Sequence, residues 1–305
     1  MKKLIYSLLL ITSIVGITSC GSGNNATNSD QASATEGSVS ATKTQQLNIV
    51  VLLDLSDRIL KEKNPSNMER DIEIVRNLTK IFKQDMAAKG AYSAKGKMQV
   101  VFSPAPSNPA IAELASLLNY DLSEMQEPKA KKVVYDSIET RFTRAMTQLY
   151  TIAQEKSEWP GCDIWRFFKD DIETYLKDGY RNVVVVITDG YIYYEKTKYQ
   201  SEHKYTYLLP QNLNSEKLRG DIMKIPEIIS KNNFGLMPTG KKYPEVEAMF
   251  LELSPSNDFP SDYDVMDIVL QNWCNEMDMK KVKVRKTDMP VNTAKVINAF
   301  FSSTK

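Results

Sequence analysis

The stretch that decides the fold is Asn182-Val-Val-Val-Val-Ile-Thr188, which runs directly into Asp189-Gly190. Every residue between its two polar ends is apolar, so it lacks the alternation of a strand with one solvated face. Asn48 to Leu53 (NIVVLL) repeats this pattern and runs into Asp54. Continuous apolar strands of this kind are buried on both faces, which is typical of parallel sheets covered by helices.

Segments with helical periodicity separate these strands. Ser66-Asn67-Met68-Glu69 fits a capping box, and apolar residues follow it at helical spacing as far as Gly90. Further helices are predicted over residues 138–152, 163–176, 264–277 and 292–301, and further strands over residues 97–102, 248–253 and 281–285. This alternation predicts a three-layer, Rossmann-like α/β fold with a mostly parallel central sheet and helices on both faces.

The first twenty residues have the pattern of a bacterial lipoprotein signal. Lys2 and Lys3 are followed by an apolar stretch over residues 4–17, and Ile17-Thr18-Ser19-Cys20 resembles the lipobox. We expect residues 1–19 to be removed and Cys20 to be lipidated, which anchors the protein to a membrane of the cell envelope, facing outside the cytoplasm. An ordinary secretory peptide or an uncleaved anchor is the alternative, and the pattern does not separate periplasmic from surface exposure.

Composition divides the rest of the chain in two. Residues 20–46 contain almost no large apolar residue and predict a flexible tether, whereas residues 47–305 predict one α/β domain. Lys plus Arg number 39 and Asp plus Glu 38, a net charge of +1, so no broad positive field favours a nucleic-acid partner. Cys162 and Cys274 form a disulfide or remain two buried thiols, and the sequence leaves both options open.

Two predicted strands end in acidic turns. Asp54-Leu55-Ser56-Asp57-Arg58 follows the first, and Thr188-Asp189-Gly190 follows the strongest. The carboxyl ends of parallel strands meet at one edge of a sheet, where ligands bind in open α/β folds. Oxygen-only side chains suit a hard divalent cation, so the sequence predicts a site for Mg²⁺, or for Mn²⁺ or Ca²⁺.

These motifs resemble the von Willebrand factor type A family and its metal-ion-dependent adhesion site. Asp54 and Ser56 match that family's first motif and Asp189 its last, while the middle element falls at Cys162-Asp163. The resemblance implies a metal held by these three oxygen ligands with Asp163 as the fourth, and completed by an acidic group of the partner. Two departures are Arg58, in place of a serine, and Cys162, at or beside the expected threonine.

A metal-free arrangement of the same edge is the alternative. Asp54 and Asp189 could cap helices or pair with Arg58. If the guanidinium of Arg58 lies between the two carboxylates, it supplies the positive charge internally and excludes the ion.

The segment over residues 191–246 is longer than a connection between two strands needs, and it begins at the predicted metal edge. It carries several tyrosines, a residue type common in recognition surfaces. Together with Arg58, we expect Tyr191, Tyr193 and Tyr194 to contact a partner. The alternative is a covering hairpin whose tyrosines pack on the domain. A helix near residues 215–230, interrupted by Pro226, is also predicted.

Sequence motifs of the major enzyme classes are missing. There is no Walker A loop, no Gly-x-Ser-x-Gly and only one histidine, His203, so no catalytic residue is assigned. The predicted function is binding of a protein or glycan partner at the cell envelope. The alternatives are a Mg²⁺-dependent phosphohydrolase with Asp54 as nucleophile, and a structural envelope subunit with a degenerate metal site.

Overall fold

A six-stranded, mostly parallel sheet organises the protein. The computed structural model describes residues 45–155 and 162–303. The strand order is β3-β2-β1-β4-β8-β9, and only the edge strand β3 is antiparallel to its neighbour. The strands are β1 (Gln46–Leu53), β2 (Lys97–Val101), β3 (Asn119–Asp121), β4 (Tyr180–Ile187), β8 (Val246–Leu253) and β9 (Lys281–Lys286). The predicted α/β fold with a mostly parallel sheet is confirmed.

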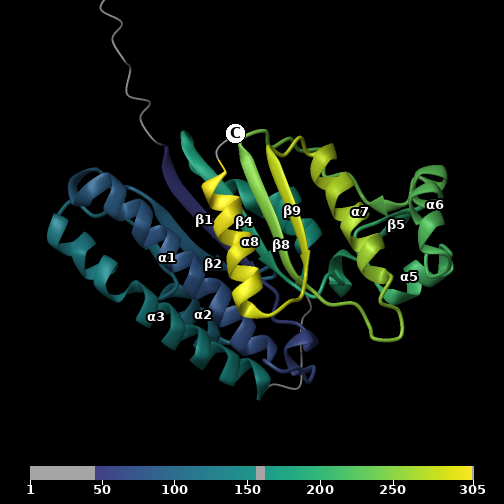
Figure 1. The fold of residues 1–305 in the computed structure, drawn as a ribbon, viewed down its shortest axis with the longest axis horizontal. Coiled ribbons are helices and arrows are strands. Elements are labelled where there is room, and N and C mark those ends of the chain that lie inside the picture. The colour runs from purple at the N-terminus through teal and green to yellow at the C-terminus, as the bar shows by residue number, and fades with distance from the viewer. Residues whose placement is uncertain (1–44, 156–161, 304–305) are drawn as a thin grey trace, which may run out of the picture. The chain divides into compact units, whose positions relative to one another are not determined.

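Helices cover both faces of this sheet (Figure 1). Alternate residues of β1 enter opposite cores, with Ile49 and Val51 on one face and Val50 and Leu52 on the other. The first face carries α1 (Asn67–Ser93), α2 (Pro109–Ser116), α3 (Pro128–Gln154) and α8 (Pro290–Ser302). The second carries α4 (Ile164–Arg166) and α7 (Asp262–Glu276). The central strands are therefore buried on both sides, as their apolar runs predict.

The predicted capping box at the start of α1 is present. The Ser66 hydroxyl accepts a hydrogen bond from the Glu69 amide at 3.2 Å, and the Glu69 carboxylate accepts one from the Ser66 amide at 2.8 Å. Gly90 does not end the helix but kinks it, with a φ of +74°, and the helix continues to Ser93. Glycine tolerates this left-handed conformation without a steric penalty.

Two predicted helices are present as helical segments but are not single regular α-helices. The segment 163–176 contains only the short α4, followed by a π-helical turn over Phe167–Asp171 and a 3₁₀ turn over Ile172–Thr174. Phe167 and Phe168 are both buried in the second core. The π turn is a single wider turn within this helical segment.

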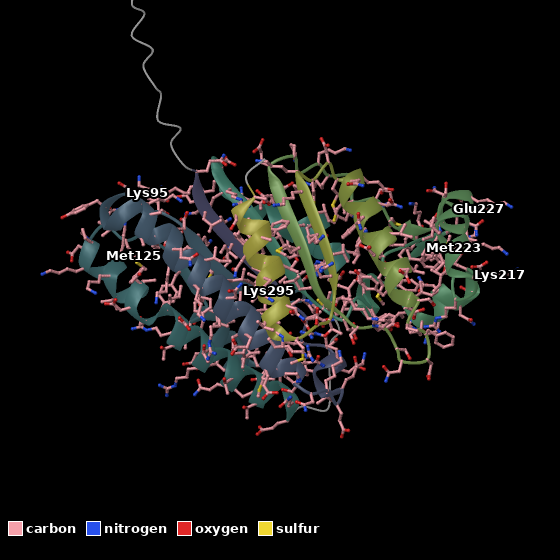
Figure 2. All side chains as sticks on the ribbon, viewed as in Figure 1. Lys95, Met125, Lys217, Met223, Glu227 and Lys295 are labelled. Atoms are coloured by element: carbon pink, nitrogen blue, oxygen red, sulfur yellow. The ribbon has the colours of Figure 1, made fainter. Side chains whose placement is uncertain are left out.

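The segment 215–230 is likewise not one interrupted helix. It contains the end of α5 (Pro210–Ser215), a 3₁₀ turn η5 (Ile222–Lys224) and most of α6 (Ile225–Asn232). Pro226 lies in the first turn of α6, where a missing amide hydrogen costs nothing, so it begins a helix instead of breaking one. Figure 2 shows Lys217, Met223 and Glu227 projecting outward from this part of the chain.

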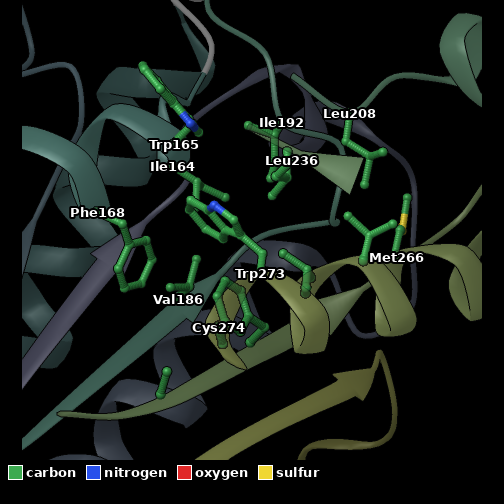
Figure 3. Packing of buried hydrophobic residues seen from close by; sticks show 14 of the residues in the cluster. Ile164, Trp165, Phe168, Val186, Ile192, Leu208, Leu236, Met266, Trp273 and Cys274 are labelled. Carbon is green, nitrogen blue, oxygen red and sulfur yellow. The ribbon is translucent and has the colours of Figure 1, made fainter. Parts of the chain in front are cut away.

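The long segment between β4 and β8 packs on the second core, where its Ile192, Leu208 and Leu236 belong to the same buried cluster as Trp165, Phe168 and Trp273 of the flanking elements (Figure 3). Trp273 of α7 is 1% exposed and makes an edge contact with Phe168 at 5.3 Å between ring centroids. The indoles of Trp165 and Trp273 both donate hydrogen bonds to the Met237 carbonyl, at 2.8 and 3.1 Å. Met237 directly follows β7 (Gly235–Leu236), which forms a small sheet with β5 (Gln200–Ser201) and β6 (Lys204–Tyr205).

Several predictions concern residues or properties outside this architecture. The signal peptide, Cys20 and nearly all of the predicted tether lie outside the described residues. Cys162 and Cys274 are two free, buried thiols and do not form a disulfide with each other. Within the described part of the chain, no helix is both long and apolar enough to cross a membrane.

Candidate binding cleft at the carboxyl edge of the sheet

Asp54 and Asp189 lie at the point where the strand order reverses. β1 and β4 pair in register as far as Leu53 and Ile187, so the two acidic turns leave the sheet side by side. The oxygens of the buried Asp54 carboxyl accept hydrogen bonds from the Ser56 amide and the Thr188 hydroxyl, each at 2.8 Å. Burial is the main cause that raises the pKa of Asp54, although the charge of Arg58 opposes it. The Asp54 carboxyl is thus buried, and both of its oxygens are hydrogen-bonded within the protein.

Arg58 does not lie between the two carboxylates, as the metal-free prediction required. Its buried guanidinium bonds Asp71 of α1, and its Nε donates to the Asp54 carbonyl at 2.9 Å. The same Asp71 oxygen accepts a hydrogen bond from Tyr150 of α3. The side chain carboxylate of Asp54 is 3.8 Å from Nε of Arg58. Arg58 belongs to the 3₁₀ turn η1 (Asp57–Leu60), which directs its side chain into the space between β1, α1 and α3.

Lys61 supplies the cation that contacts Asp189. Its Nζ is 2.6 Å from an Asp189 oxygen and 5.7 Å from the centre of the Tyr191 ring. The other Asp189 oxygen accepts a hydrogen bond from the Tyr191 amide at 3.1 Å. The lysine side chain is 44% exposed, whereas that of Asp189 is 7% exposed. Sequence reasoning missed Lys61, since no motif relates it to Asp189.

Asp163 has a structural role in the described conformation. Its carboxylate caps α4 by accepting from the Arg166 amide at 2.9 Å, and it also accepts from the Thr197 hydroxyl at 2.6 Å. The preceding Cys162 donates its amide to the Tyr193 carbonyl at 3.0 Å. Burial raises the pKa of Asp163. Burial also raises the pKa of the Cys162 thiol, well above its ordinary value. These contacts attach the inserted segment to the sheet edge.

The residues expected to hold a divalent cation do not form a ready ligand set. Asp54 is hydrogen-bonded through both oxygens, Asp189 bonds Lys61 and Asp163 bonds Thr197. Among the residues that the structure describes, no cluster of three or more His, Cys, Asp and Glu side chains is arranged to hold a metal. In this arrangement a divalent ion would have to displace Lys61 from Asp189 and share the other carboxylate oxygens with the hydrogen-bond donors that already contact them.

A cleft of about 1250 Å³ opens beside this edge. Ser56, Lys61 and Asp189 line it from the sheet side, while Tyr193 and Tyr207 line it from the inserted segment. Its other lining residues are mostly polar or aromatic: Asp57, Glu62, Lys63, Cys162, Tyr191, Lys198, Gln200, Tyr205, Leu209, Pro210, Gln211, Asn212, Ser215, Ser254, Pro255, Ser256 and Asn257. Of the residues that the sequence assigned to the metal or to a partner, the cleft is lined by Ser56, Asp189, Tyr191 and Tyr193, but not by Asp54, Arg58, Asp163 or Tyr194.

The inserted tyrosines are held in defined positions. The Tyr191 hydroxyl donates to Asp262 at 2.7 Å, and Arg219 forms two bonds to the same carboxylate. Lys198 lies over both Tyr193 and Tyr207, at 5.5 and 5.6 Å from their ring centres. Cation–π contacts of this kind orient aromatic rings without enclosing them. Tyr193 and Tyr207 form the aromatic wall of the cleft, and this wall is half-buried and preorganised.

Exposed apolar side chains occur in the loops at the same edge. Leu60 follows β1, Phe259 follows β8, and Met289 and Val291 follow β9. Each is between 38% and 62% exposed. Arg70 of α1 bonds the Asp288 carbonyl and so fixes the last of these loops. None of these four side chains lines the cleft itself.

Comparison of the sequence with protein-family models gives no match, and comparison with curated proteins gives none either. The family resemblance therefore rests on the motifs at the sheet edge and on the order of the strands.

Proposed function

We propose that this protein is a lipid-anchored binding protein of the bacterial cell envelope, which holds a protein partner in the cleft at the carboxyl edge of its sheet. The observation that carries the proposal is the tyrosine lining of the cleft, in which Lys198 holds Tyr193 and Tyr207. Aromatic side chains in a partly enclosed cleft are frequent anchors of protein interfaces.

The proposal includes the resemblance to von Willebrand factor type A domains. Without the three short strands of the insertion, the order β3-β2-β1-β4-β8-β9 is a doubly wound order with its switch point between β1 and β4. Asp54, Ser56 and Asp189 follow those two strands, where that family binds its ligands. Rossmann-like folds in general share this strand order, so it agrees with the assignment, which rests on the motif.

The other candidate functions have weaker support. A glycan is the second candidate partner, because amide and hydroxyl side chains such as Gln200, Asn212 and Ser56 also line the cleft. A phosphohydrolase that uses Asp54 as nucleophile is disfavoured, since this carboxyl is fully buried and bonded through both oxygens. A nucleophile must reach its substrate.

Replacing either Tyr193 or Tyr207 of the cleft is expected to weaken partner binding strongly. In Tyr193→Ala and Tyr207→Ala, loss of a central aromatic contact should weaken binding at least about 30-fold, which corresponds to about 2 kcal/mol. A photo-crosslinking amino acid at position 193 of the full-length chain, used in envelope extracts, should capture the partner. Affinity of the identified partner for each variant can then be measured by calorimetry.

Tyr92 provides the matched control for this experiment. It is 85% exposed near the carboxyl end of α1, at the opposite edge of the sheet from the cleft. Tyr92→Ala should bind the partner as the wild type does, and a crosslinker at position 92 should not capture it. Equal capture from both positions, or full affinity in both cleft variants, would refute the proposed site. Capture of a polysaccharide alone would favour the glycan.

Lipidation is tested at Cys20. In Cys20→Ala the acyl chains have no attachment point, so the protein should move from the membrane fraction to the soluble fraction. Mass spectrometry of the wild-type protein should show an acylated cysteine as its first residue. A wild-type protein that is soluble, or that carries no acyl mass, would contradict the lipid anchor and leave the cleft proposal unaffected.

A further inference from the structure

We infer that the side chains of Arg58 and Lys61 take the electrostatic role of a divalent metal at this sheet edge, so that binding at the cleft needs no metal ion. The inference rests on the proposed function only in regarding this edge as the binding face. Its basis is the position of two positive side chains beside the two carboxylates that the family resemblance assigns to the metal.

Arg58 supplies a fixed charge beneath the site. It is buried beside the Asp54 turn and the pair formed by Asp71 and Tyr150. Its guanidinium donates hydrogen bonds to the Asp54 carbonyl and to the Asp71 carboxylate, which fix its position. A guanidinium does not lose its proton in proteins, and the buried carboxylate of Asp71 pairs with it directly. An ion bound to Asp54 would stand close to this guanidinium and be repelled by it.

Lys61 supplies a movable charge at the surface of the site. Its ammonium contacts the Asp189 oxygen at 2.6 Å, and the lysine itself lines the cleft. Since the ammonium of Lys61 has three donors, it can bond Asp189 and a partner's carboxylate at once. In a metal-dependent site, the ion would connect Asp189 and the partner's carboxylate. The lysine therefore fits a partner with an acidic side chain and provides the bridge without an ion.

Metal titration of the full-length protein tests the inference without a partner. A divalent ion that bound only the folded state would raise Tm by roughly 5–10 °C at a hundred times its Kd. The wild type in MgCl₂, MnCl₂ or CaCl₂ should show no rise beyond that in KCl of equal ionic strength. A saturable rise in the wild type that Asp189→Asn removes would overturn the inference.

Lys61→Ala is the decisive variant, because this side chain is largely exposed and its loss leaves the core intact. With Asp189 uncovered, the variant should gain a metal-dependent rise in Tm, and adding Asp189→Asn should remove it. No gain in Lys61→Ala would overturn the role assigned to Lys61.

The partner provides a second readout. Capture through the cleft should survive EDTA in the wild type and decrease in Lys61→Ala. Capture that EDTA abolishes would overturn the inference while supporting the proposed function, so the two can fail separately.

Discussion

Replacing Arg58 with alanine is expected to lower the free energy of unfolding by about 3–5 kcal/mol. The guanidinium is buried, and in the described part of the chain it forms the ion pair with Asp71. Its removal leaves Asp71 and Asp54 in a dry environment without their positive partner, and neither carboxylate can recover water. One oxygen of Asp71 already has no hydrogen-bond partner in the described structure. Urea denaturation followed by circular dichroism measures the loss.

Arg76 is the matched control for Arg58. It also belongs to the α1 region and pairs with an acidic residue, Glu73, but both side chains are about one-third or more exposed. Surface pairs contribute at most about 1 kcal/mol, so Arg76→Ala should remain close to the wild type. A loss below 1 kcal/mol in Arg58→Ala would mean that the buried network does not stabilise this edge.

Replacing Trp273 with alanine is expected to have an equally large effect, about 3–5 kcal/mol. The indole is fully buried at the centre of the second core, where it contacts Phe168 and bonds the Met237 carbonyl. Alanine leaves a large cavity, since α7 and the π-helical segment cannot both move into the space. The variant should also loosen the inserted segment, because Met237 loses one of its two indole donors. Calorimetric unfolding and partner affinity measure the two effects.

Tyr92→Ala serves as the control here too, because an exposed aromatic residue contributes little to the core and should change stability by less than about 0.5 kcal/mol. Trp273→Phe retains most of the buried area and should lose less than Trp273→Ala. Equal losses in both Trp273 variants would point to the hydrogen bond, instead of the volume, as the stabilising factor.

The sequence by itself determined the layers of the fold. Residues 48–53 and 182–188 are apolar throughout, and a strand without a polar face can lie only between two covering layers. The capping box at Ser66 fixed the start of α1, because its bonds join residues three positions apart. The same local reading placed Asp54, Ser56 and Asp189 at one sheet edge, since each follows the carboxyl end of a central strand.

Only the tertiary structure decided which charges meet at that edge. Arg58 bonds a carboxylate 13 residues away, and Lys61 bonds one 128 residues away. Neither separation leaves a local pattern, because a long charged side chain reaches whichever partner the packing of strands and helices brings near. Asp163 likewise accepts the Thr197 hydroxyl, 34 residues away, which depends on where the insertion packs. Local periodicity therefore fixes the elements and their edge, whereas the pairing of charges depends on how those elements pack.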